Sequence, residues 1–246
     1  MEMFGPLGLS FIAGISTTIG CVFIFLKIKR VEEFIAYSLA FSFAVMFLLS
    51  IFDLIPSSLR IIINDFGVFF GVILAFLMIL LGSTTIRIIN DKIPTKISCN
   101  LYRVGVLSMI SLMAHNIPEG IAVYVSAYSD IALGMSVCIA IMLHNIPEGI
   151  AISVPLYYSG IKRWKVVLYT LVSGLSELFG AIMGHIFLRK IATDNLISFV
   201  LLFVAGLMLN LSYNDILKEA LSYNKFRYVI LGIVSGGVMF VIAGLI

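Results

Sequence analysis

The sequence has little charge for its length. Of its 246 residues only 12% are Asp, Glu, Lys or Arg, whereas 61% are hydrophobic, and a soluble domain carries about twice that share of charge. This composition excludes an ordinary cytosolic enzyme and a disordered chain. The net charge of +3 is too small to indicate nucleic-acid binding. The mean hydropathy of +1.13 indicates that lipid is the solvent.

Cysteine is equally scarce. The three cysteines, Cys21, Cys99 and Cys138, form no CxxC pair, and an odd number cannot all pair within one chain. They predict free thiols and exclude a secreted disulfide scaffold. No Lys or Arg precedes the first apolar run, whereas a signal peptide begins with basic residues, so this run is expected to stay in the protein.

Long apolar segments fill almost the whole chain. A helical span needs about 20 mostly apolar residues, and the breaks between such segments, two of which are 56–65 and 218–227, leave eight candidates. These are residues 5–26, 34–55, 66–86, 104–128, 131–157, 166–188, 196–217 and 228–246. The sequence predicts an all-α integral membrane protein with eight transmembrane helices, which form a single transmembrane domain over residues 1–246.

The basic residues are distributed unevenly over the breaks. Of the 16 Lys and Arg residues, 13 lie in the breaks that follow the first, third, fifth and seventh segments. Short cytoplasmic loops are enriched in Lys and Arg. The distribution therefore predicts that both termini lie outside, and it supports an even number of spans.

Internal repeats relate the two halves of the chain. Residues 115–122 (HNIPEGIA) recur without change as residues 144–151, and residues 14–20 more weakly resemble residues 174–180. A fainter match is the spacing of Met46, Ser50 and Asp53, which recurs in Met208, Ser212 and Asp215. The first three and last three spans thus form two halves of opposite topology around a central pair. Such a 3+2+3 inverted repeat is typical of secondary transporters, whose site lies near the midplane.

Seven polar side chains lie in the middle of predicted spans, where charge is costly. They are His115, Asn116, Glu119, His144, Asn145, Glu148 and Glu177. Each mid-bilayer carboxylate costs roughly 2.5–3.5 kcal/mol on insertion scales. One explanation is a structural hydrogen-bond network, but neutral side chains would form it at lower cost. An ion-binding site explains the carboxylates better.

The spacing within the repeated motif favours metal binding. His115 and Glu119 are four residues apart and share a helix face, and Asn116, three residues before Glu119, also lies beside that carboxylate. The carboxylate between an imidazole and an amide suits a ligand that bridges two cations. A proline in each copy frees a carbonyl one turn back, which is tolerated in a membrane where it lines a cavity. Gly120 and Gly149 are expected to let the two motif helices approach closely.

The donor types narrow the choice of ion. Imidazole and carboxylate together suit Zn²⁺, Fe²⁺, Mn²⁺ or Co²⁺. Calcium and magnesium favour oxygen ligands alone, so the paired histidines argue against them. Without thiolates the site is not expected to be a tight, closed zinc site, and moderate affinity suits a protein that must release its ion.

These motifs resemble one known family. The doubled HNIPEG, Glu177 within SGLSELFG (173–180) and the 3+2+3 arrangement are similar to the Zrt- and Irt-like (ZIP) divalent-metal transporters, especially the bacterial ZupT-like and GufA-like branch. The resemblance implies a secondary transporter that moves zinc, or iron, manganese or cobalt, into the cytosol through a binuclear midplane site. It implies a multi-pass protein of the plasma membrane, of the bacterial inner-membrane type. The metal is then substrate and there is no resident cofactor; a homodimer is a candidate assembly.

The resemblance also distributes the ligands over two sites. One site would use His115, Glu119, His144 and Glu148. The other would use Asn116, Asn145 and Glu177, with Glu119 and Glu148 bridging. Thr17 stands at the place that the weak repeat pairs with Glu177, so the two halves differ there. Asp53, near the outer end of the second span, is either an entrance ligand or a water-facing helix end.

Two other functions are compatible with parts of the sequence. An intramembrane metalloprotease places His-Glu-x-x-His on one helix, and this chain contains only His-x-x-x-Glu, twice; an enzyme is therefore not expected. A metal-selective channel stays an alternative, because conduction and alternating access can use the same ligands.

Overall fold

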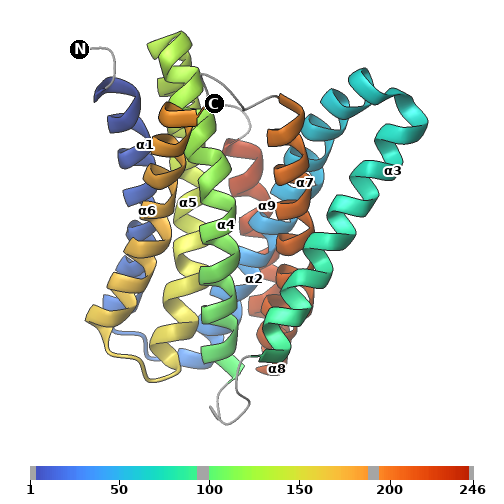
Figure 1. The fold of residues 1–246 in the computed structure, drawn as a ribbon. Helices are drawn as coiled ribbons and strands as arrows, with labels where there is room; N and C mark the ends of the chain where they lie inside the picture. Colours follow the sequence, from blue (N-terminus) through green and yellow to red (C-terminus); the bar gives the residue numbers. More distant parts are fainter. Residues whose placement is uncertain (1–3, 93–99, 188–193, 244–246) are drawn as a thin grey trace.

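The computed structural model describes residues 4–92, 100–187 and 194–243, and within these ranges the chain is helical without any β-strand. The helices follow one another in the order of Figure 1. They are α1 (Phe4–Ser16), the 3₁₀ helix η1 (Thr17–Phe25), α2 (Val31–Leu49), the π-helix η2 (Ser50–Leu54), α3 (Ile55–Lys92), α4 (Asn100–Ser129), α5 (Ile131–Tyr158), α6 (Arg163–Phe187), α7 (Asp194–Leu211), the π-helix η3 (Ser212–Leu217), α8 (Lys218–Ser222) and α9 (Phe226–Ala243).

Within the described residues, seven helical segments are long and apolar enough to cross a membrane. They are Gly5–Phe25, Val31–Phe66, Val68–Ile89, Leu101–Tyr128, Ile131–Tyr158, Arg163–Ile186 and Ser198–Ser222. A shorter apolar helix, Phe226–Ile242, follows them. The chain is therefore a helical, multi-pass membrane protein, and the eighth span stays a prediction.

The break predicted at residues 56–65 is wrong. The helix continues from η2 through this segment to Phe66, and the chain reverses at Gly67, whose φ of 78° is a conformation that only glycine adopts at little cost. Pro56 ends no helix because it follows the π turn and sits in the first turn of α3, where a missing N–H is tolerated. The Ser57 hydroxyl donates to the Asp53 carbonyl at 2.6 Å and satisfies one acceptor of this irregular turn.

The predicted break at residues 218–227 is also too long. The seventh span runs through the π-helix η3 and α8 to Ser222, so that only Tyr223–Lys225 separate it from α9. Both long continuous spans thus pass through a π segment, η2 in one and η3 in the other. In both spans the helix continues past the apolar segment into residues that include Arg60 or Lys218. Periodicity and charge alone do not show whether such residues are helical. The predicted boundaries at Arg189–Asn195 fall largely outside the described residues.

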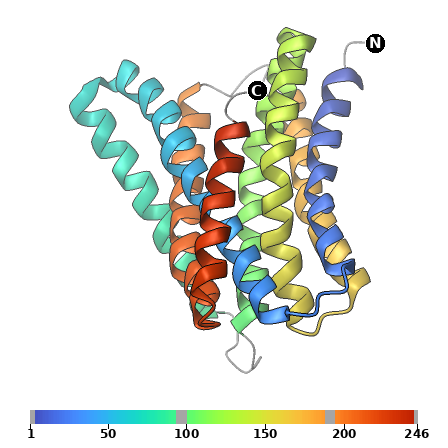
Figure 2. The ribbon, with the colours of Figure 1, turned by 180° about the vertical axis from the view of Figure 1, so that it is seen from behind.

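The helices form two groups that meet along α4 and α5. In Figures 1 and 2, α1 and α6 lie on one side of α4 and α5, while α2, α3, α7 and α9 lie on the other. The most extensive packing pairs α3 with α7, α2 with α9, and α4 with α5 and α6. η1, which continues α1, packs against α5. The first half of α3 and the second half form a hairpin that leans away from the bundle (Figure 1).

Glycines allow α1, η1, α4, α5 and α6 to touch one another backbone to backbone. Gly14 and Gly174 face each other, and a Cβ on either would collide with the carbonyl of the other. Gly120 lies against the Glu177 carbonyl of α6, and Gly149 against the Thr17 carbonyl of η1. The expectation that Gly120 and Gly149 bring α4 and α5 together is therefore wrong in its partners: each glycine joins its motif helix to a flanking helix.

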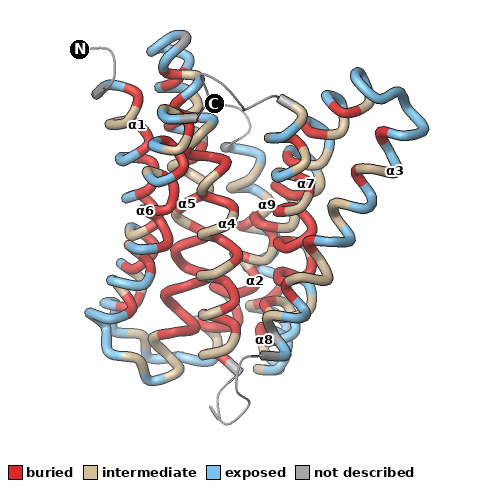
Figure 3. Tube along the Cα trace, viewed as in Figure 1, coloured by how far each residue is buried: buried red, intermediate tan, exposed pale blue. Residues whose placement is uncertain are grey.

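Burial separates an interior from a lipid-facing surface. The buried residues line the inner sides of α2, α4, α5 and α7 (Figure 3). Large apolar side chains such as Phe69 and Phe76 on α3 are mostly exposed, as expected where lipid covers the surface. Cys21 and Cys138 are buried free thiols, as predicted; Cys99 lies outside the described residues.

Candidate metal centre

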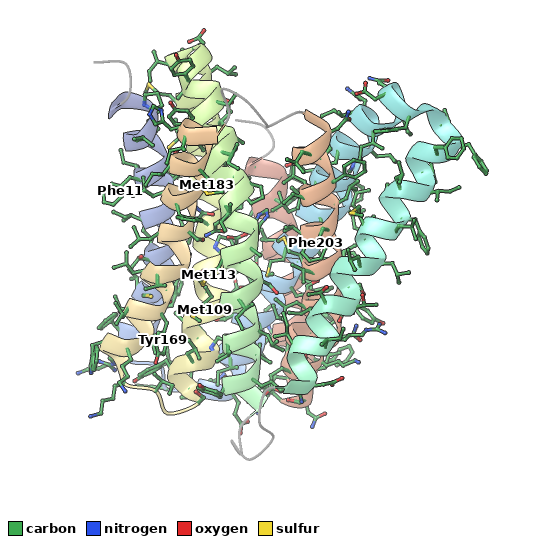
Figure 4. All side chains as sticks on the ribbon, viewed as in Figure 1. Phe11, Met109, Met113, Tyr169, Met183 and Phe203 are labelled. Atoms are coloured by element: carbon green, nitrogen blue, oxygen red, sulfur yellow. The ribbon has the colours of Figure 1, made fainter. Side chains whose placement is uncertain are left out.

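The first copy of the motif lies on α4, which passes through Pro118 without ending. His115 and Asn116 are fully buried, and Glu119 is nearly so. Met109 and Met113, labelled in Figure 4, mark the two turns of α4 that precede His115 and lie near the middle of its length. These polar groups therefore lie near the middle of a long apolar helix.

The second copy lies on α5, which likewise continues through Pro147. Asn145 and Glu148 are buried, whereas His144 is half-buried. The repeated motif thus does not give its two copies equal surroundings. His115 lies in the interior, and His144 retains contact with the surface.

The imidazole of His115 joins the two copies. Its Nε2 lies 3.0 Å from Oε1 of Glu119 on the same helix and 3.5 Å from Oε1 of Glu148 on α5. The first contact follows from the spacing of four residues. The second requires α4 and α5 to pack side by side, which they do. One nitrogen therefore lies between two carboxylates.

Glu177 joins this cluster from α6 through Asn145. The Asn145 amide nitrogen donates to Oε2 of Glu177 at 3.0 Å and to the Ala13 carbonyl at 2.9 Å. The Asn116 amide nitrogen donates to the Ser173 carbonyl at 3.1 Å. Because both amides donate to neighbouring helix backbones, their oxygens are left free to face elsewhere. The backbone anchors at Ala13 and Ser173 were not predicted, since a carbonyl leaves no mark on a sequence.

Many nitrogen and oxygen atoms of this cluster that could bind a metal are buried and make no hydrogen bond to the chain within its described ranges. They are Nδ1 of His115, Oδ1 of Asn116, Oε2 of Glu119, Oδ1 of Asn145, both carboxylate oxygens of Glu148 and Oε1 of Glu177. Leaving a buried polar atom unpaired costs about 1–3 kcal/mol. A cation would satisfy several of them at once.

The cluster is not drawn together as tightly as an occupied metal site. Among the described residues, no group of three or more His, Cys, Asp and Glu side chains already has the arrangement that holds an ion. The donors come from three helices, so small side-chain movements decide whether they converge. The chemistry of the donors, nitrogen and carboxylate oxygen, nevertheless suits a divalent transition metal.

Asp53 lies beside the cluster. It is part of η2, where the helix widens into a π turn, and it is exposed. Its carboxylate is close enough to His144, Glu119 and His115 to interact with them electrostatically. Thr17, the counterpart of Glu177 in the weak repeat, is buried and its hydroxyl makes no hydrogen bond within the described chain.

His185 has a partner of its own. Its Nδ1 lies 2.7 Å from the Tyr124 hydroxyl, and the two rings meet edge to face. This contact ties α6 to α4 near the end of α6, two turns beyond Glu177. His185 is thus engaged in the packing of α6 against α4.

Comparison with known proteins agrees with the resemblance in the motifs. The sequence profile of the ZIP zinc transporter family matches residues 95–243. A zinc transporter ZupT of Streptococcus mutans is 32% identical, over 96% of this chain and 94% of the relative. One from Nitratidesulfovibrio vulgaris is 32% identical over 94% and 93%, and one from Clostridium perfringens is 29% identical over 96% and 93%.

The matches to these relatives extend over 94–96% of this chain rather than over a single motif. The proteins of this family are transporters and not enzymes, and a metal ion is their substrate rather than their cofactor. The motifs on α4 and α5, the glutamate of α6 and the match along the chain lead to one conclusion: this chain belongs to the ZIP zinc transporter family.

Proposed function

We propose that this protein is a secondary transporter that carries zinc into the cytosol, and that iron, manganese and cobalt are further substrates of the same site. The relatives are named zinc transporters. The observation that carries the proposal is the set of buried donor atoms on α4, α5 and α6 that make no hydrogen bond to the described chain. A membrane interior tolerates such groups where they serve an ion pathway.

The proposed centre holds two ions. The first would be bound by His115, Glu119, His144 and Glu148. The second would be bound by Asn116, Asn145 and Glu177, with Glu119 and Glu148 bridging both ions. Two contacts support this division: His115 lies near both bridging carboxylates, and Glu177 contacts Asn145 rather than either histidine.

Asp53 is proposed as the entrance ligand. It is exposed, it interacts electrostatically with the motif side chains, and its π turn directs backbone carbonyls away from regular helical pairing. An acidic group at this place would raise the local concentration of cations. The half-buried His144 would be the first imidazole that an ion reaches from Asp53.

The proposed topology has eight spans over residues 1–246, arranged 3+2+3 with both termini outside, in the plasma membrane. The packing is consistent with this symmetry, because α3 with α7 and α2 with α9 are corresponding pairs. The π segments η2 and η3 also occupy corresponding places in the second and seventh spans. We also propose that two copies of the chain form a homodimer.

Uptake into proteoliposomes tests the function. We expect saturable zinc uptake that competing Mn²⁺, Fe²⁺ or Co²⁺ lowers and that Ca²⁺ and Mg²⁺ leave unchanged. Planar-bilayer recordings on the same preparation should show no single-channel current. Zinc flux equal to that of protein-free vesicles would overturn the proposal, and discrete zinc currents with flux that does not saturate would replace the transporter with a channel.

A further inference from the structure

A charged hollow lies where α2 and α9 begin. Its volume is about 340 Å³. Its lining contains both signs of charge: Lys29, Arg30, Val31, Glu32, Glu33 and Lys225. Figure 2 shows these two helix starts side by side at the lower end of the bundle. This end carries the basic connections, so it is expected to meet the lipid head groups of the cytoplasmic leaflet.

An apolar hollow adjoins the charged one. It measures about 380 Å³ and is lined by Phe34, Tyr37, Tyr228 and Leu231. Arg30 and Glu33 line both hollows and form their common wall. Tyr37 lies six residues after the start of α2, which places it about 9 Å deeper along the helix. The pair of hollows therefore changes from charged to apolar with depth, as one phospholipid molecule does.

The charges of the common wall are only partly engaged. The Arg30 guanidinium donates from Nη1 to the Tyr228 hydroxyl at 3.3 Å, and its Nε lies 3.6 Å from Oε2 of Glu33. The Arg30 side chain lines the hollow and is 76% exposed, so a ligand can reach its guanidinium, which has five N–H donors. Oε2 of Glu33 makes no hydrogen bond with any described residue. The Tyr228 hydroxyl and the Glu33 carboxylate hold the pKa of Arg30 above its ordinary value.

We propose that these hollows bind one phospholipid with an ethanolamine head group. Arg30 would bind the phosphate, Glu33 would accept hydrogen bonds from the primary ammonium, and an acyl chain would lie along Tyr37 and Leu231. Glu32 is paired with Lys225 at 3.2 Å, so the Glu33 carboxylate beside Arg30 is the group that disfavours a purely anionic head group. A choline head group has no N–H donor for Glu33, so it would bind less well.

Lipid retention on the purified protein tests the proposal. Native mass spectrometry is carried out after delipidation and addition of phosphatidylethanolamine, phosphatidylglycerol or phosphatidylcholine at equal concentration. We expect one phosphatidylethanolamine to be retained in preference to the other two. Arg30→Gln and Glu33→Gln should each lower its retention about tenfold, a charge-assisted hydrogen bond being lost in each. Leu231→Trp should lower it by filling the apolar hollow.

Matched variants separate this site from general lipid coating. Arg87→Gln and Asp91→Asn remove exposed charges at the same end of α3, away from both hollows, and they should leave retention unchanged. Equal retention of the three lipids, preference for phosphatidylglycerol, or parent-like retention by Arg30→Gln and Glu33→Gln would overturn the proposal. Because the readout is lipid mass, it is independent of whether the protein transports zinc.

Discussion

His115 is the side chain at which the two copies of the motif meet. Its position between Glu119 and Glu148 makes these carboxylates the donors most easily shared by two ions. The sequence could predict the first contact from helical spacing. The second depends on how α4 and α5 pack, and the amide anchors at Ala13 and Ser173 depend on backbone atoms. Residue identity therefore named the candidate donors, whereas the contacts that orient them depend on the packing of the helices.

The shared carboxylates should matter more for transport than the histidines. Loss of an outer contact to a metal ligand already costs about 10–100-fold in affinity, so Glu119→Ala and Glu148→Ala should lower initial zinc uptake by at least about tenfold. His115→Ala and His144→Ala should retain more uptake and shift preference from zinc toward manganese, because nitrogen donors are lost. Initial rates with both metals, normalised to protein in the vesicle membrane, measure this.

If the glutamate variants transport as well as the parent, the bridging model fails. The polar cluster would then be a structural network. Thermal unfolding of each purified variant serves as the control, since removing a buried charge can change stability without any effect on metal binding.

Glu177 should serve one ion only. It reaches the cluster through Asn145 and lies on α6, apart from both histidines. We expect Glu177→Gln to lower the bound metal from about two ions to about one per chain, because the ligand count of the second site falls. Elemental analysis of purified protein measures this, with Ser176→Ala on the same helix as control. An unchanged metal content would remove Glu177 from the ligands.

At the scale of elements, hydropathy located the spans well but not their ends. The segments around the motifs match α4, α5 and α6 closely. In contrast, the predicted break at 56–65 is helical, because the π turn η2 accommodates Pro56. The chain reverses its direction only at Gly67. Charged and polar residues near a membrane surface are compatible with either a helix or a loop, so composition alone cannot decide between them.

The close approach of α4 to α6 yields a prediction about packing. A Cβ on Gly120 would collide with the Glu177 carbonyl, whereas a Cβ on Gly8 of α1 would meet no atom within 4 Å. Gly120→Ala should therefore destabilise the protein by about 1–3 kcal/mol, and Gly8→Ala should be neutral or stabilising by up to about 1 kcal/mol, since alanine favours helix. Unfolding midpoints in detergent compare the two.

The Gly120→Ala substitution should also displace Glu177 and weaken zinc binding. This would couple helix packing to the metal centre. Equal midpoints for Gly120→Ala and Gly8→Ala would contradict a close contact of α4 with α6 at Gly120.

At the scale of the whole molecule, the two helix groups meet mainly through apolar surfaces. Within the described residues, the Ser42 hydroxyl of α2 donates to the Pro147 carbonyl of α5 at 2.9 Å and so links the groups beside Glu148. Proline leaves carbonyls of the preceding turn unpaired, and here its own carbonyl also finds a partner on another helix. The inverted repeat could be suspected from sequence, yet this contact between α2 and α5 could not, since serine is common in any span.

Orientation is the last property that the basic residues predict. Of the 16 Lys and Arg residues, 13 lie in the breaks expected to face the cytosol. In a background without native cysteines, Ser129→Cys, between α4 and α5, should react with impermeant maleimide added outside intact cells. Ser159→Cys, between α5 and α6, should react only after the membrane is opened. Both sites lie at the ends of the motif helices, so the pair also fixes the direction of α4 and α5. The opposite labelling pattern would reverse the protein in the membrane and would place Asp53 on the cytosolic side, where it could not serve as an entrance for inward transport.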